Sequence, residues 1–324
     1  MITAIIPTRN DPMLQETIGS IIQGSDASLK MIIVNDAGAE SIALKNKKIV
    51  SLLNGCQLGP AMSRHVGAQA ATTDWLMFCD GHMLFPKNWY SIVCPILERA
   101  NPEDVFCSVY HSDVIFDPFW HDTHLIGGAD FYFWRHRDRE YSFCDLSPRR
   151  VKGNFIYNVP CVLGACYFVN RQWFNSIGGF SKMTGYGSEE TWLSWNSWMA
   201  GGEASVISQL SVTHRYQGRP RPSHNLLPQH QLNRLIVLRR ILTPDQYGEF
   251  CSWIPIDANI KAQVDLLDIS HYDETGTRLA AKRVGHPEIC QQFGLQTYEE
   301  AIELMREFHD KNILQNCRNQ ENAG

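Results

Sequence analysis

The chain has 324 residues, of which 44% are hydrophobic and 19% are charged. This composition is typical of a folded globular protein, in one large domain or two ordinary ones, and it excludes a disordered chain. The formal net charge of −5 excludes the global positive field that would attract nucleic acid or an anionic membrane.

The cellular compartment can be inferred from apolar runs and cysteines. No apolar run is long enough to span a bilayer, and an apolar strand-like segment starts at Ile2, which leaves no room for a signal peptide. The ten cysteines are scattered, and several of them, such as Cys79 and Cys166, fall inside apolar segments, as reduced buried thiols do. We therefore expect a cytoplasmic protein with no membrane partner.

Strands and helices alternate in the first 110 residues. A strand over residues 1–6 should end at Pro7, which cannot donate to a sheet hydrogen bond. In a helix over residues 60–70, Met62, Val66 and Ala70 should face the sheet, whereas Ser63 and Arg64 should not. Further strands are predicted over residues 30–34, 48–50 and 105–110, and further helices over residues 13–23 and 89–98. This alternation predicts an α/β fold with a mostly parallel, doubly wound sheet flanked by helices.

A short apolar strand over residues 75–79 runs directly into Asp80-Gly81-His82. Residues i and i+2 of an extended chain point to the same side, so this carboxylate and this imidazole should converge. Gly81 leaves room for close approach by a ligand or by another backbone segment. The pattern predicts a ligand site at the carboxyl end of a buried strand, where open α/β sheets hold their ligands. The alternative is an ordinary Asp-Gly turn with an exposed His82.

The second half of the chain mixes ordered and weakly patterned segments. Residues 111–158 are dense in aromatic and Arg side chains, which favours either an acceptor-binding region or an excursion that covers one face of the sheet. Strands are predicted over residues 161–170, 204–207 and 212–214, helices over 171–177 and 231–242, and a mobile loop over 215–228. A further helix, with Trp192, Trp195 and Trp198, follows Glu189-Glu190 and should end at Gly201-Gly202. The capping box Thr297-x-x-Glu300 indicates one helix in the tail.

Taken together, residues 1–240 resemble the nucleotide-sugar glycosyltransferases with the GT-A fold, in particular the catalytic domain of the polypeptide N-acetylgalactosaminyltransferases (families 2 and 27). The resemblance implies a catalytic domain over residues 1–245, followed by a helical C-terminal extension over residues 246–324. The matching blocks are the strand before Thr8-Arg9-Asn10-Asp11, Asn35-Asp36, Ser63-Arg64, Asp80-Gly81-His82, and Gly187-Ser188-Glu189-Glu190 with Gly201-Gly202 and His214 beyond.

The resemblance implies a divalent metal held by Asp80, His82 and His214. Because the nucleotide diphosphate leaving group gains negative charge as the sugar–phosphate bond breaks, a bound cation would neutralise it. Mixed carboxylate and imidazole ligands suit Mn²⁺, with Mg²⁺ also possible. A packed or helix-capping histidine is the alternative role for His214.

For the donor, the resemblance implies that Asp36 reads the nucleoside, beside Thr8 at the end of the first strand. Asn35 stands where the family more commonly has Asp, so the base preference is open. Arg64 would supply positive charge near the diphosphate or form a surface salt bridge instead. The small pair Gly164-Ala165 would let the donor sugar lie against the backbone, and Tyr186 stands where the family has Trp.

Two adjacent acids are the implied catalytic residues. Glu189 matches the acidic residue at the sugar end of the site. Glu190 departs from the Asn of the retaining N-acetylgalactosaminyltransferases, whereas inverting relatives use a second acid here as general base. Overall similarity therefore favours retention, and a basic role for Glu190 would favour inversion.

The sequence thus predicts a metal-dependent glycosyltransferase that moves a sugar from a nucleotide donor, with UDP favoured, to a hydroxyl. The acceptor is open among a protein, a glycan, a small molecule and hydroxymethylated pyrimidine in bacteriophage DNA. The DNA alternative rests on aromatic and Arg residues in segment 116–150, which could hold an extruded base. Two other classes are a sugar-1-phosphate nucleotidyltransferase, whose Gly-rich phosphate loop the sequence lacks, and a noncatalytic sugar-binding protein.

Overall fold

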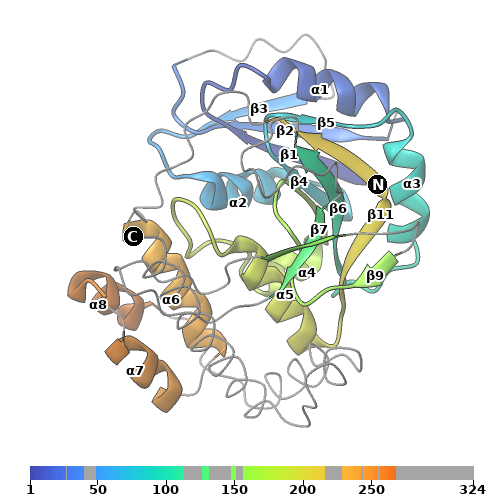
Figure 1. The fold of residues 1–324 in the computed structure, drawn as a ribbon. Coiled ribbons are helices and arrows are strands. Elements are labelled where there is room, and N and C mark those ends of the chain that lie inside the picture. Colours follow the sequence, from blue (N-terminus) through green and yellow to red (C-terminus); the bar gives the residue numbers. More distant parts are fainter. Residues whose placement is uncertain are drawn as a thin grey trace, which may run out of the picture.

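A computed structural model describes residues 1–26, 28–39, 49–112, 126–130, 147–150, 156–215, 228–241, 244–253 and 256–267. The central strands run in the order β3-β2-β1-β4-β10-β6-β11-β5 within one sheet (Figure 1). These strands are β1 (Ile2–Thr8), β2 (Lys30–Asn35), β3 (Ile49–Leu53), β4 (Trp75–Cys79), β5 (Met83–Leu84), β6 (Val105–Ser112), β10 (Cys166–Asn170) and β11 (Ala204–His214). Shorter strands β7 (Ile126–Asp130), β8 (Ser147–Arg150) and β9 (Ile156–Asn158) join the sheet beside this path.

Helices cover both faces of the sheet, and each face has its own apolar core. One core packs α1 (Leu14–Gln23) and α3 (Trp89–Leu97) against the sheet, and the other packs α2 (Pro60–Ala70), α4 (Arg171–Ser176) and α5 (Glu189–Ala200). Along β1, Ala4 and Ile6 enter the first core and Ile5 enters the second, as strand alternation requires. The predicted doubly wound α/β fold class is therefore confirmed.

The pairing is mixed rather than parallel throughout. Strands β1 to β4 pair in parallel as predicted, and so do β6 and β11, but β10 runs antiparallel between β4 and β6. Cys166, the first residue of β10, lies opposite Cys79, the last residue of β4. The amino end of β10 therefore meets the carboxyl ends of β1, β2, β4 and β11 at one edge of the sheet. This edge carries the site described below.

Several predicted strand ends are corrected by the structure. Strand β1 does not stop at Pro7, because Pro7 pairs in register with Val34 and the strand continues to Thr8. The strand predicted over residues 161–170 begins only at Cys166. The two strands predicted over residues 204–207 and 212–214 form one strand, β11, with an irregularity between Ile207 and Ser211.

The predicted buried face of α2 was wrong. The structure buries Ser63 and Arg64, while Met62 and Val66 are only half-buried and Ala70 is exposed. The helix lies so close to the sheet that a Cβ on Gly67 would lie 2.4 Å from Cγ2 of Ile5. Large apolar side chains would not fit on that face, and the charged residue there, Arg64, is paired with two carboxylates.

The C-terminal part continues with α6 (Pro228–Ile241), α7 (Pro244–Trp253) and α8 (Ala258–Leu266). Leu235 of α6, Tyr247 of α7 and Val264 of α8 belong to the same apolar core as α2 and α5. A domain boundary at residue 245 stays a prediction. The tail helix near Thr297, most of loop 215–228 and most of segment 111–158 lie outside the described residues. Within the described ranges, no helix is both long and apolar enough to cross a membrane.

Candidate active site

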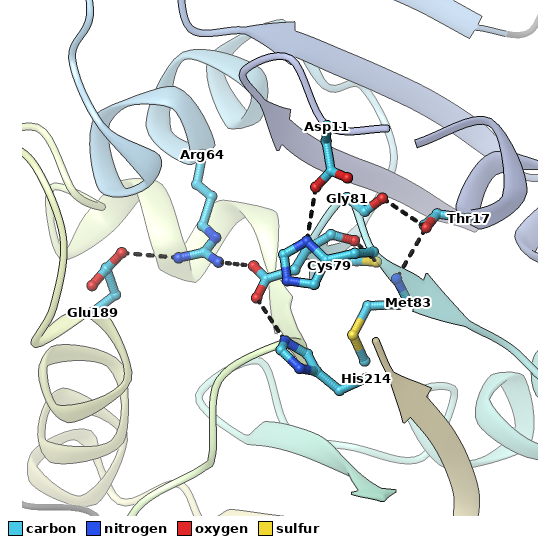
Figure 2. A network of polar contacts seen from close by, with 10 residues as sticks. Asp11, Thr17, Arg64, Cys79, Gly81, Met83, Glu189 and His214 are labelled. Atoms are coloured by element: carbon cyan, nitrogen blue, oxygen red, sulfur yellow. Dashed lines mark hydrogen bonds and ion pairs between the residues drawn. The ribbon is translucent and has the colours of Figure 1, made fainter. Parts of the chain in front are cut away.

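The first three predicted site residues converge at the edge where β4 and β11 end. Asp80 and His82 form the turn between β4 and β5, and His214 is the last residue of β11, opposite Met83 of β5. Potential ligand atoms of Asp80, His82 and His214 all lie within 4.8 Å of one another. The Nε2 of His214 is 3.4 Å from Oδ2 of Asp80 (Figure 2), and the two imidazole rings meet edge to face. Two segments separated by more than a hundred residues thus meet as expected.

The turn that carries these residues is held from several sides. Thr17 of α1 donates its hydroxyl to the carbonyl of Gly81 at 2.8 Å and accepts from the backbone N–H of Met83 at 3.0 Å. The backbone N–H of Asp80 donates to the carbonyl of Ala165. These bonds hold the backbone of the turn that carries Asp80 and His82.

The donor set suits a divalent cation. One carboxylate and two imidazoles are the mixed oxygen and nitrogen ligands that manganese and similar metals accept in proteins. The pKa of Asp80 is held well below its usual range: burial opposes this shift, but the hydrogen bond from His214 and the charge of Arg64 outweigh it. Asp80 is therefore ionised at neutral pH, as a metal ligand must be. These residues fit a metal site.

Arg64 lies between two carboxylates. Its Nη2 is 2.6 Å from Oδ1 of Asp80, and its Nη1 is 2.9 Å from Oε1 of Glu189 (Figure 2). The Arg64 side chain is 4% exposed and that of Glu189 is 1% exposed, so this is a buried charge network. The alternative of a surface salt bridge for Arg64 does not hold, because the guanidinium is buried. Its guanidinium joins the turn at Asp80 to the start of α5.

Replacing Arg64 with Met is expected to lower the free energy of unfolding by about 3–5 kcal/mol, because the charge of Glu189 stays buried without a partner. Chemical denaturation measures the change. The double variant R64M/E189Q should regain part of the loss, since a neutral amide needs no counter-charge. The matched control Lys261→Met breaks an exposed pair with Asp265 and should cost less than about 1 kcal/mol. Equal losses in both single variants would contradict the buried network.

The two adjacent acids have different surroundings. Glu189 is engaged by Arg64, whereas Glu190 forms no ion pair within the described part of the chain and its side chain is half-buried. Burial raises the pKa of Glu190 to about 7, and the neighbouring charge of Glu189 adds to the shift. A carboxylate that titrates near neutral pH can accept a proton. The predicted pair thus separates into one structural acid and one acid suited to proton transfer.

Gly164 and Ala165 lie beside this second acid, just before β10. A Cβ on Gly164 would lie 2.4 Å from Oε1 of Glu190, so the absence of a side chain at residue 164 leaves space for that carboxylate. Ala165 has a positive φ of 76°, a conformation that L residues seldom adopt. The strained backbone at Ala165 directs its carbonyl at the N–H of Asp80. This hydrogen bond connects the segment beside Glu190 to the turn that carries Asp80.

The residues predicted to bind the nucleoside, Thr8, Asn35 and Asp36, lie where β1 and β2 end. The buried hydroxyl of Thr8 has no hydrogen-bond partner among the described residues, which leaves it available to a ligand. Asn35 is 6% exposed and its side chain closes a turn with the backbone of Gly38. Asp36 accepts three hydrogen bonds, from Asn54 and from the backbone of residues 58 and 59. One acceptor position on Oδ2 of Asp36 is therefore left for a donor group.

Tyr186 lies on the loop between α4 and α5, and it is 62% exposed. Asn233 of α6, which is fully buried, bonds the backbone N–H and carbonyl of Thr184 and the carbonyl of Gly187. Sequence reasoning missed Asn233, because a lone Asn in a helix gives no signal of its partner. It also named Asp11 only within the matching block Thr8-Arg9-Asn10-Asp11, although Asp11 contacts His82.

Comparison with known proteins found a matching family profile and several similar proteins. The profile of the family described as glycosyl transferase family 2 matches residues 3–177, more than half of the chain. Polypeptide N-acetylgalactosaminyltransferase 16 of Homo sapiens is 26% identical over 220 residues, which cover 64% of this chain and 38% of that protein. Polypeptide N-acetylgalactosaminyltransferase 8 of Drosophila melanogaster is 25% identical over 234 residues, covering 67% of this chain and 38% of that protein.

One solved structure supports the fold. The crystal structure of GalNAc-T7 with UDP, GalNAc and Mn²⁺ superposes with a TM-score of 0.58 at 20% identity, covering 76% of this chain and 50% of that chain. The chain thus spans well under two thirds of the relatives it matches.

Proposed function

Because the chain belongs to glycosyl transferase family 2 and has the GT-A fold, we propose that it transfers a sugar from a UDP-sugar donor to an acceptor hydroxyl with the help of a divalent metal. The observation that carries this proposal is the convergence of Asp80, His82 and His214 at the carboxyl ends of β4 and β11. The relatives named above are N-acetylgalactosaminyltransferases, and one was crystallised with UDP and Mn²⁺. These properties are extended to this chain as part of the proposal.

The metal, with Mn²⁺ favoured, would be held by one oxygen of Asp80 and one ring nitrogen each of His82 and His214. When bound, the metal supplies positive charge that stabilises the departing diphosphate. The chain supplies the fixed geometry, because the turn is bonded to Thr17 and Ala165 on either side. Preorganised ligands lower the cost of ordering the site when the donor binds.

The donor would lie along the sheet edge from β2 to β10. The free hydroxyl of Thr8 and the remaining acceptor position of Asp36 suit the nucleoside, which offers N–H and hydroxyl donors. The sugar end would lie near Glu190, whose carboxylate takes the space that a side chain at Gly164 would fill. Arg64 would act from behind this surface, holding Asp80 and Glu189 in place, and so serves as a positioning residue rather than a direct diphosphate ligand.

Glu190 would deprotonate the acceptor hydroxyl as that oxygen attacks the sugar carbon. Its raised pKa and its lack of an ion pair in the described residues fit this role, whereas the bond from Arg64 occupies Glu189. A base on the acceptor side favours direct displacement, so the product would have the inverted anomeric configuration. A retained configuration, which similarity to the relatives favours, would contradict this assignment.

The acceptor class stays open in this proposal. The aromatic and Arg residues that suggested a DNA acceptor fall mostly in residues 116–125 and 131–146, outside the described residues. No specific observation therefore favours a second function over transfer to another hydroxyl acceptor.

The test of the proposed function is UDP release from a panel of UDP-sugars, measured with Mn²⁺ and after removal of metal by EDTA. We expect release of UDP with at least one donor, loss of that release in EDTA, and recovery when Mn²⁺ is added in excess. Release that is unchanged by EDTA would contradict metal dependence. Absence of both release and binding across the panel would contradict the donor class.

A further inference from the structure

The imidazole of His82 contacts the carboxylate of Asp11, a residue in the turn before α1. Oδ2 of Asp11 is 2.8 Å from Nδ1 of His82 (Figure 2). Both side chains are largely buried, with Asp11 6% and His82 16% exposed. We propose that Asp11 is a positioning residue that fixes the tautomer and the ring direction of His82, so that Nε2 faces the metal. This inference rests on the proposed metal-dependent function.

The orientation of the Asp11 carboxylate is fixed at both oxygens. Oδ1 accepts a hydrogen bond from the backbone N–H of Met13 at 3.0 Å, and Oδ2 faces the imidazole. An ionised carboxylate can only accept hydrogen bonds, so Nδ1 of His82 carries the hydrogen. In the neutral ring Nε2 then keeps its lone pair, which is the form that binds a metal. Carboxylate–histidine–metal chains of this kind raise ligand basicity and hold the ring.

The same segment holds the turn on the other side of His82. Thr17, on the helix that follows Asp11, bonds the carbonyl of Gly81 and the N–H of Met83. A Cβ on Gly81 would lie 3.0 Å from Oδ2 of Asp11, so the glycine permits the close approach of this carboxylate. Thr17 therefore holds the backbone before and after His82, while Asp11 holds the imidazole ring and selects its tautomer.

Asp11→Asn provides the sharpest test, because the amide has a preferred orientation. The N–H of Met13 needs an acceptor, so the amide oxygen takes that position and the NH₂ group faces Nδ1 of His82. The amide then donates to Nδ1, and the hydrogen of His82 moves to Nε2. In this tautomer the metal-facing nitrogen has no lone pair. The substitution keeps size and the bond to Met13, so the fold should be preserved.

We expect Asp11→Asn to weaken Mn²⁺ binding by about 10–100-fold, the usual effect of losing such a partner. Asp11→Ala should weaken it less, since His82 is then free to adopt either tautomer. Asp74 lies at the amino end of β4, far along the strand from Asp80, in an exposed pair with the N-terminus. The matched control Asp74→Asn should therefore leave the Mn²⁺ affinity unchanged. Mn²⁺ affinity is measured by electron paramagnetic resonance of the free ion, with and without UDP.

A second measurement needs no metal. Nitrogen NMR of the metal-free protein reports which ring nitrogen of His82 carries the hydrogen, and we expect Nδ1 in the wild type and Nε2 in Asp11→Asn. Hydrogen on Nε2 in the wild type would overturn the inference. If the wild type binds Mn²⁺ and the Asp11→Asn variant binds it equally tightly, the inference is also overturned. A wild type that binds no Mn²⁺ with UDP present would overturn both this inference and the metal-dependent function.

Discussion

Asp80→Asn is expected to abolish Mn²⁺ binding and to lower the rate of sugar transfer by about a thousandfold or more, since a bound metal contributes several kcal/mol to transition-state stabilisation. Asp80 contacts both the imidazole of His214 and the guanidinium of Arg64. Its replacement therefore removes the one anionic member of the proposed ligand set and also removes the ion pair between Asp80 and Arg64. Initial-rate kinetics and Mn²⁺ titration measure the two effects.

The loss should be similar at every working pH. Although burial alone would raise the pKa of Asp80, the bond from His214 and the charge of Arg64 hold it well below its usual range, so the carboxylate stays ionised. The depressed pKa also means that Asp80 stabilises the fold above its unfolded pKa of about 4, and that this contribution is lost as the pH falls further. Asp74→Asn, an exposed carboxylate flanking the same strand, is the matched control. Activity in Asp80→Asn that still responds to Mn²⁺ would contradict the ligand assignment.

Glu190→Gln is expected to lower transfer by about 100–10,000-fold while leaving donor binding nearly unchanged, because general-base catalysis contributes on that scale. Burial and the charge of Glu189 raise the pKa of Glu190 to about 7, and the base acts only when deprotonated. The wild-type rate should therefore fall as the pH drops below about 7, tenfold per pH unit, and this dependence should disappear in the variant. A pH–rate profile with a saturating donor measures it.

The raised pKa also has a stability cost with a definite sign. Protonated Glu190 is compatible with its site, and stability is lost as the pH rises from the unfolded value of about 4.3 through the folded value. Glu190→Gln should therefore be more stable than the wild type at pH 8 and similar at pH 4, as measured by thermal unfolding. The control Glu98→Gln, at the exposed end of α3, should change neither rate nor stability. An unchanged pH–rate profile in Glu190→Gln would show that another group is the base.

The sequence was most informative where a signal is local. Strand alternation and helical spacing depend on neighbouring residues, so the elements around the first core and the turn Asp80-Gly81-His82 could be located from the chain alone. Two side chains on one short turn must lie close together whatever the rest of the fold does. The ordered set of motifs also placed His214 in the same site through resemblance, and the structure brings that imidazole to Asp80.

Other features depend on contacts between segments far apart in the chain. Helical spacing alone placed Arg64 on the outer face of α2, and its buried position follows from carboxylates 16 and 125 residues away. The direction of β10, the separate environments of Glu189 and Glu190, and the contact of Asp11 with His82 likewise arise from packing across the sheet edge. Periodicity reports how apolar a position is, but burial of a charge depends on which partner meets it, and that is set when distant segments come together.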